Sequence, residues 1–305
     1  GASFYFAENP AYGAVFSYYI GEDFTSLKTK RQKKDAKLRK EGEPVYYPSW
    51  DELKEEDLEL ASHLVFTVKD MEGNVVRRLT APAKKGFNRI AWDLRYPGFG
   101  VVSKNVTKDS GPFVVPGKYQ VSVSKVVNGV DTAYEGSQSF EVVAFENRTF
   151  KSNDRNADLA FDMKAGQLAS AINGVQNHIG SLAKRIDNIG YSTTQTLSAP
   201  QALHSQVAQM KRELTEVKYL LNGNRVIAKR AEPTPTSVQG YIGYLQWSRS
   251  ESTGPVSGQQ KLRYNRASEG FDVVYQRTKA LTELVEKLEG QLKGLNSNFL
   301  PNTGI

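Results

Sequence analysis

The sequence contains no cysteine, and this absence excludes disulfide bridges, cysteine-ligated zinc sites and cysteine nucleophiles together. Histidine is scarce as well. His63, His178 and His204 are scattered along the chain, and no two of them have the HxxxH or HExxH spacing of a zinc site. We therefore expect neither a metal site nor a cofactor.

Long apolar runs and the common catalytic motifs are also missing. No apolar run approaches the ~20 residues of a transmembrane helix, so we expect no membrane span. Neither a glycine-rich phosphate loop nor the G-x-S-x-G turn of hydrolases is present. The stretch Gly240-Tyr241-Ile242-Gly243 falls in a predicted helix, where its glycines favour close packing. The sequence shows no recognisable active site, and we do not expect this chain to be an enzyme.

Four acidic residues are candidates for paired carboxylates or a calcium loop: Asp70, Glu72, Asp93 and Asp109. The spacing of an EF-hand loop is absent. A glycosidic acid–base pair needs two carboxylates that converge in one cleft, which sequence spacing does not establish. Asp70 and Glu72 flank a turn, where aspartate bonds to the local backbone. We expect Asp93 to cap the loop that follows it.

The formal net charge is +7, and it is concentrated in one segment. Residues 28–40, KTKRQKKDAKLRK, hold eight lysines and arginines against one aspartate, so the rest of the chain is nearly neutral. Such a run is able to bind nucleic acid or an anionic surface. No DNA- or RNA-binding motif accompanies it, however, so a solvated helix face is favoured and no nucleic acid partner is expected.

The most informative stretch runs from His63 to Leu94 and predicts short strands joined by turns. Leu64, Phe66 and Val68 alternate with more polar residues, the period of a half-buried strand. Residues 70–74, DMEGN, supply turn chemistry. Val75, Val76 and Leu79 restart the apolar pattern, and Phe87, Ile90 and Trp92 close it. Short strands between such turns are typical of an antiparallel β-sandwich.

The flanking segments extend this prediction. Residues 14–20 form a strand whose two faces are both apolar, which predicts burial on two sides. Strands at 117–127 and 133–144 are joined by a hairpin turn at Asn128-Gly129. Residues 21–62 are an insertion between strands. They contain a charged helix over 22–42 and a short acidic helix, which Ser49 begins with the capping-box spacing to Glu52.

A different pattern occupies the second half. Apolar residues step by four and three, which predicts three helices with apolar seams and breaks at 190–200 and 223–235. The first seam is Leu168, Ile172, Val175, Ile179, Leu182, Ile186 and Ile189; the second is Leu203, Val207, Met210, Leu214, Val217 and Leu221; the third runs from Phe271 to Leu295. A shorter helix is predicted over 237–249. Seams this short are stable only when they pack together as a bundle.

The motifs D-x-x-G-N-V-V-R-x-L (from Asp70), K-G-x-N-R-I-x-W-D-L-R (from Lys85) and V-P-G-K-Y-x-V-S (from Val115) resemble the FlgD-like immunoglobulin-type domain. More narrowly, the chain resembles the C-terminal region of bacterial BNR-repeat or sortilin-like β-propeller glycosyl hydrolases. The stretches Asn9–Ile20, Tyr47–Leu53 and Phe299–Gly304 fit that match, which covers most of the chain. The resemblance implies export, and it implies that any active site lies in the propeller, which this chain does not contain.

Exposed aromatic side chains bind sugars by stacking, and several are placed for that role. Tyr96 and Phe99 lie in a proline- and glycine-rich loop, where binding residues concentrate. Trp50 and Tyr47 begin the short acidic helix, and Tyr46 and Trp247 are further candidates. Packing in a core or against another domain is the competing explanation for each of them.

We therefore expect an α+β multidomain chain. Residues 1–150 form an Ig-like, fibronectin III-like antiparallel β-sandwich with a charged helical insertion at about 21–62, and residues 151–305 form an antiparallel three- to four-helix bundle. The start Gly1-Ala2-Ser3 lacks an initiator methionine, so we expect a piece of a longer precursor. Its expected role is that of a non-catalytic accessory region that braces or positions the propeller. A carbohydrate-binding module and a hydrolase in its own right are the alternatives.

Overall fold

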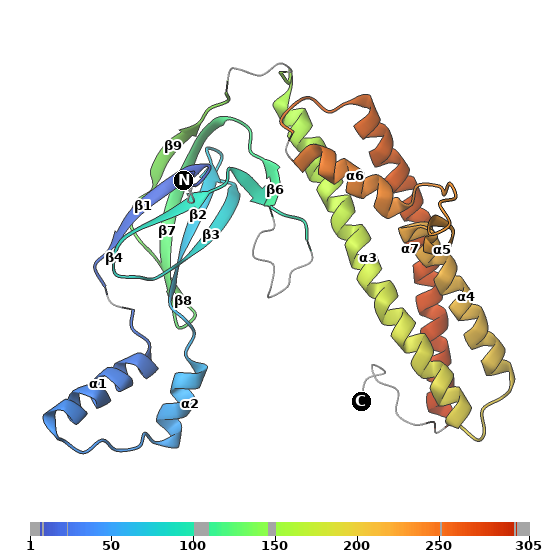
Figure 1. Ribbon diagram of the computed structural model, residues 1–305, viewed down its shortest axis with the longest axis horizontal. Helices are drawn as coiled ribbons and strands as arrows, with labels where there is room; N and C mark the ends of the chain where they lie inside the picture. Colours follow the sequence, from blue (N-terminus) through green and yellow to red (C-terminus); the bar gives the residue numbers. More distant parts are fainter. Residues whose placement is uncertain are drawn as a thin grey trace, which may run out of the picture. The chain divides into compact units, whose positions relative to one another are not determined.

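The structure is a computed structural model that describes residues 7, 9–22, 24–100, 110–145, 151–250, 252–295 and 297 (Figure 1). It is a mixed α and β structure with antiparallel sheets and several helices. The chain divides into a sheet unit, residues 1–97 and 113–147, and a helical unit, residues 98–112 and 148–305. Residues 4–6 and 8 at the start of the chain, and all of the motif 299–304, lie outside the described residues.

The strands of the sheet unit form antiparallel ladders. The larger sheet has the order β3-β2-β7-β8, and β9 also pairs with β7. Its strands are β2 (His63–Asp70), β3 (Val75–Pro82), β7 (Gly117–Val127), β8 (Val130–Ala133) and β9 (Gln138–Val142). A two-stranded sheet pairs β1 (Ala14–Ile20) with β4 (Gly86–Trp92). A further short pair is β5 (Arg95–Pro97) with β6 (Ser110–Phe113).

One apolar core joins the two larger ladders of the sheet unit. Leu64, Phe66 and Val68 of β2 are buried, as their alternation predicts. The ring of Phe66 lies 4.9 Å from that of Tyr18 on β1, measured between ring centroids. Trp92 of β4 is fully buried, and its ring lies 5.6 Å from that of Tyr119 on β7. Side chains from both ladders therefore pack into the same interior.

The turn predictions are confirmed at the residue level. Asn128 and Gly129 both have positive φ, 47° and 81°, and they connect Val127 to its partner Val130. This is the conformation that makes Asn-Gly a favoured hairpin pair. The Asp70 carboxylate accepts hydrogen bonds from the backbone N–H groups of Glu72 (3.0 Å) and Asn74 (2.8 Å), so it closes its own turn.

Two strand predictions are wrong. The single strand expected over 133–144 is split into β8 and β9, and the residues between them include Gly136 at φ 91°. The strand at 14–20 is not buried on both sides within the described chain, because Val15 and Tyr19 are 47% and 62% exposed. The apolar character of both faces does not produce two-sided burial here, since the larger sheet packs against only one face.

The insertion forms two helices, α1 (Leu27–Glu41) and α2 (Trp50–Leu58). The charged helix begins at Leu27 rather than Glu22, because Ser26 caps it by accepting a hydrogen bond from the Thr29 backbone N–H. It ends at Gly42, which has φ 74°. The predicted capping box is confirmed: the Ser49 hydroxyl accepts from the Glu52 N–H, and the Glu52 carboxylate accepts from the Ser49 N–H.

In the helical unit the predicted seams are buried in one shared core. Its helices are α3 (Arg155–Gln195), α4 (Ala202–Asn222), α5 (Arg225–Ala228), α6 (Val238–Ser250) and α7 (Gly258–Gly294). Figure 1 shows α3, α4 and α7 running alongside one another, in agreement with their contacts. The break expected at 190–200 is confirmed only for residues 196–200, since α3 continues through Gly190 to Gln195. Gly190 lies beside Val207 of α4, whose side chain would be 3.5 Å from an added Cβ.

Candidate functional site

Two of the four predicted aromatic candidates lie fully in solvent. Tyr47 and Trp50 are each 87% exposed, and neighbouring Tyr46 is 82% exposed. Trp50 is the first residue of α2, and the two tyrosines lie in the connection from α1. The capping box at Ser49 holds this connection through backbone and hydroxyl groups. The three rings are therefore available to a partner, and no polar contact within the capping box involves them.

Tyr96 is placed differently. It is partly buried and packs against the core of the sheet unit. Burial raises the pKa of its hydroxyl, and the negative charge of Asp70 adds to that shift. Its backbone carbonyl accepts a hydrogen bond of 2.9 Å from Arg77. A packing role accounts for much of this side chain's environment.

Phe99 belongs to the residues that group with the helical unit. Its ring lies against α3 at Gly166, where an added Cβ would be only 2.1 Å from the ring. Gly166 therefore provides the space that the ring occupies. As with Tyr96, the structure gives Phe99 a packing contact.

Trp247 forms an exposed aromatic pair on α6. Its ring lies 5.6 Å from that of Tyr244, and Trp247 is 71% exposed. The guanidinium of Arg263, from α7, stacks over the Tyr244 ring at 3.8 Å. This arrangement fixes Tyr244 and leaves the Trp247 face toward solvent.

The acidic and histidine candidates that the structure describes make hydrogen-bonding contacts within their own units. The Asp93 carboxylate accepts a hydrogen bond from the Arg95 N–H at 3.2 Å, so it caps the following loop as predicted. Asp109 lies outside the described residues. His63 Nδ1 lies 3.0 Å from the Ala61 carbonyl oxygen, and His178 Nε2 lies 2.9 Å from the Thr282 hydroxyl. Across the described part of the chain, no three histidine, aspartate or glutamate side chains are grouped as metal ligands.

The insertion separates charge between its two helices. Over Leu27–Glu41, α1 carries eight basic and two acidic side chains; over Trp50–Leu58, α2 carries five acidic and one basic. The two helices are joined by a bidentate pair, with Arg31 Nε and Nη2 lying 2.5 and 2.8 Å from the Glu56 carboxylate oxygens. This hydrogen bonding lowers the pKa of Glu56. Within these two described ranges no residue is buried, so polar contacts carry much of the pairing.

Within the described residues, an exposed apolar surface lies on the side of β1 and β4 that faces away from the larger sheet. Tyr19 and Phe87 are direct cross-strand partners with ring centroids 5.0 Å apart, and Phe87 is 89% exposed. Val15 lies on the same face of β1. The sequence prediction grouped Phe87 with the core residues Ile90 and Trp92. The alternation already placed it on the opposite face, three and five residues away, and that signal was missed.

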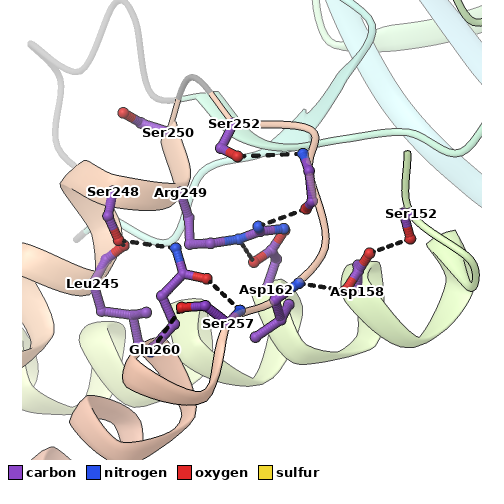
Figure 2. Close-up of polar contacts among 12 residues, drawn as sticks. Ser152, Asp158, Asp162, Leu245, Ser248, Arg249, Ser250, Ser252, Ser257 and Gln260 are labelled. Atoms are coloured by element: carbon purple, nitrogen blue, oxygen red, sulfur yellow. Dashed lines mark hydrogen bonds and ion pairs between the residues drawn. The ribbon is translucent and has the colours of Figure 1, made fainter. Parts of the chain in front are cut away.

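A partly buried polar cluster binds α3, α6 and α7 together (Figure 2). Arg249 donates to both oxygens of Asp162 at 2.7 and 2.8 Å, and to the Gly254 carbonyl at 2.9 Å. Asp158 accepts from the Val256 N–H at 2.9 Å and from the hydroxyl of Ser152. Ser257 and Gln260 form a capping box at the start of α7. These contacts hold the loop before α7 against α3, so the cluster is a structural clamp.

In the described part of the chain, no helix is both long and apolar enough to cross a membrane. Among the described residues, exposed surfaces include the outer face of β1 and β4, the charged insertion, and the aromatic rings on α2 and α6. Comparisons with protein families, with characterised proteins and with solved structures found no match to this chain.

Proposed function

We propose that this chain is a non-catalytic accessory region that docks against a neighbouring domain through the outer face of β1 and β4. The single observation that carries the proposal is the exposed aromatic pair Tyr19–Phe87, whose ring planes are tilted by 56° with centroids 5.0 Å apart. By the resemblance described above, the neighbouring domain is the β-propeller of an exported precursor, which this region braces or positions.

The energetic argument rests on the size of the exposed side chains. Burying a large apolar side chain stabilises an interface by ~1.5–3 kcal/mol relative to leaving it in water. Tyr19 and Phe87 form a contacting pair of this kind. Val15 lies further along the same face, and the cross-strand pair Ser17 and Arg89 lies between them. An aromatic centre with a polar neighbour is the composition that dominates protein interfaces.

The same proposal includes the fold type of each unit, an Ig-like β-sandwich and an antiparallel helical bundle. An Ig-like β-sandwich is supported by the shared core between the β1–β4 ladder and the larger sheet. It is supported further by Tyr119, whose hydroxyl donates to the carbonyl of Val115 upstream, the pattern of a tyrosine corner. An antiparallel helical bundle is supported by the single core that α3, α4, α6 and α7 share.

The test uses the longer precursor and a photo-crosslinking amino acid at position 87. We expect Phe87 labelled in this way to crosslink to the propeller segment, and the matched label at Val130, on the exposed strand β8, to give no product. A crosslink only at position 130, or at neither position, would refute the docking role of the β1–β4 face.

Carbohydrate binding is the second candidate, and the exposure of Tyr46, Tyr47 and Trp50 favours it. Aromatic faces that are this open are able to stack on sugar rings. Calorimetric titration with a panel of oligosaccharides tests the idea. Binding that Trp50→Ala removes and Tyr96→Phe preserves would support it. Absence of binding across the panel would remove it.

A screen of the chain against aryl-glycosides, in which we expect no turnover, tests the hydrolase alternative.

A further inference from the structure

The helical insertion presents two surfaces of opposite charge side by side. On α1 the exposed basic residues include Lys30, Lys37 and Lys40. On α2 the exposed acidic residues include Asp51, Glu55 and Asp57. The internal Arg31–Glu56 pair uses one residue of each helix and leaves most of both charge sets in solvent.

The presence of both positive and negative charge on one helical hairpin limits the classes of partner that it can bind. A nucleic acid or an anionic membrane would attract α1 but repel the five acidic side chains of α2. A second copy of the hairpin carries the same two charge sets. If the copies are related by a two-fold axis, α1 of each faces α2 of the other, and both contacts are attractive.

The aromatic residues at the turn add an apolar component. Tyr46 and Tyr47 lie between the two helices in sequence and Trp50 begins α2. All three are almost fully exposed, and Leu58 at the end of α2 is exposed as well. Trp and Tyr are enriched at the centres of interfaces because they bury a large area with few rotatable bonds. A hairpin of this kind therefore combines charge complementarity with apolar anchors.

We propose that the α1–α2 hairpin is a homotypic docking surface, through which two copies of this chain associate with α1 of one copy against α2 of the other. The proposal is independent of the docking role of the β1–β4 face. Two short helices from each copy make a small interface, so the dimer is weak and salt-sensitive.

Sedimentation velocity on the full 305-residue chain tests the proposal over a range of protein concentrations. At about 0.05 M salt we expect a reversible dimer, and at about 0.5 M salt an association at least about tenfold weaker, since screening shortens the range of exposed charges. A chain that remains monomeric at low salt up to about millimolar concentration would overturn the proposal.

Charge reversal provides the sharper experiment. One variant carries Lys30→Glu, Lys37→Glu and Lys40→Glu; the other carries Asp51→Lys, Glu55→Lys and Asp57→Lys. Each leaves Arg31 and Glu56 intact, and circular dichroism checks that the helices are retained. We expect each variant alone to dimerise at least about tenfold more weakly than the unmodified chain, because like charges then face one another.

Mixing the two variants restores opposite charges at both contacts. We therefore expect the mixture to form a heterodimer with an affinity within about threefold of the unmodified dimer. Failure of the mixture to associate would overturn the two-fold arrangement. A second outcome would also overturn the proposal: the chain stays monomeric at low salt but binds phosphatidylserine vesicles, and the variant with lysines on α2 binds them more tightly than the unmodified chain. That result would assign α1 to an anionic surface.

Discussion

At Gly13 the backbone has φ 108°, and an added Cβ would lie 1.9 Å from the carbonyl oxygen of Trp92. Both the conformation and the space require glycine at the start of β1. At Gly73 the backbone also has positive φ, 89°, but no atom lies within 4 Å of an added Cβ. A comparison of substitutions at the two glycines therefore distinguishes the cost of backbone strain, which both share, from the cost of steric overlap, which only Gly13 has.

We expect Gly13→Ala to destabilise the sheet unit by more than about 3 kcal/mol, and Gly73→Ala by about 1 kcal/mol, because only the first adds a clash to the strain. Urea unfolding followed by tryptophan fluorescence measures both, since Trp92 is the buried tryptophan and Trp50 and Trp247 are exposed. Equal effects of the two substitutions would contradict the close approach to Trp92.

Tyr119 provides a pH-dependent prediction at the same scale. Burial raises the pKa of its hydroxyl to about 12, with smaller contributions from Tyr96 and Asp70. Because the folded pKa lies above the unfolded value, the stability that depends on this group is complete below pH ~10 and is lost as the pH rises through ~12.

We expect the sheet unit to lose up to about 2 kcal/mol of stability between pH 9 and pH 11.5 through this residue, and Tyr119→Phe to reduce that loss. At neutral pH the same variant should be less stable by about 1 kcal/mol, because the Val115 carbonyl loses its donor. Urea midpoints at both pH values measure the effect. If the unmodified chain and the Tyr119→Phe variant lose the same stability between these pH values, Tyr119 does not control the loss.

At the scale of elements, ion pairs of very different burial link the helices. The Arg249–Asp162 pair joins α6 to α3 and is largely buried, with side-chain exposures of 8% and 15%. The Lys211–Asp187 pair joins α4 to α3 and is about half exposed on both sides. Both are ion pairs within the helical unit, so they form a matched comparison.

We expect Asp162→Asn to destabilise the helical unit by about 3 kcal/mol, because it leaves the buried guanidinium of Arg249 without its counter-charge. Asp187→Asn should cost less than about 1 kcal/mol, since solvent screens an exposed pair. Helix unfolding in urea, followed by circular dichroism at 222 nm, measures the difference. A loss for Asp162→Asn that is no larger than that for Asp187→Asn would rule out the clamp.

At the scale of the whole molecule, each unit has its own apolar core. Phe66 lies at the centre of one and Leu245 in the other, and both are buried. The fluorescence of Trp92 reports on the sheet unit, while the circular dichroism at 222 nm reports mainly on the helices.

We expect Phe66→Ala to lower the free energy of unfolding measured by fluorescence by about 3–5 kcal/mol and to leave the value measured by circular dichroism nearly unchanged. We expect Leu245→Ala to lower the value measured by circular dichroism by about 2–5 kcal/mol and to leave the value measured by fluorescence nearly unchanged. The reason is that each cavity forms in only one core. If either variant shifts both signals equally, the chain unfolds as one cooperative unit instead.

The sequence by itself determined the features that depend on neighbouring residues. The apolar steps from Leu168 to Ile189 specified a helix, Asn128-Gly129 specified a hairpin, and Ser49 with Glu52 specified a helix start. In each case the contacts span only a few positions, so local pattern and local chemistry were sufficient. The local glycine signal was insufficient at Gly190, where α3 continues beside Val207 of α4.

Only the tertiary structure decided which of the similar side chains face solvent. Tyr96 and Phe99 resembled Tyr47 and Trp50 as loop or helix-end aromatics, yet the first two pack and the last two are exposed. The exposed Tyr19–Phe87 pair and the Arg31–Glu56 bridge join residues 68 and 25 positions apart. Their chemistry depends on burial and distance, which arise only when remote segments pack together.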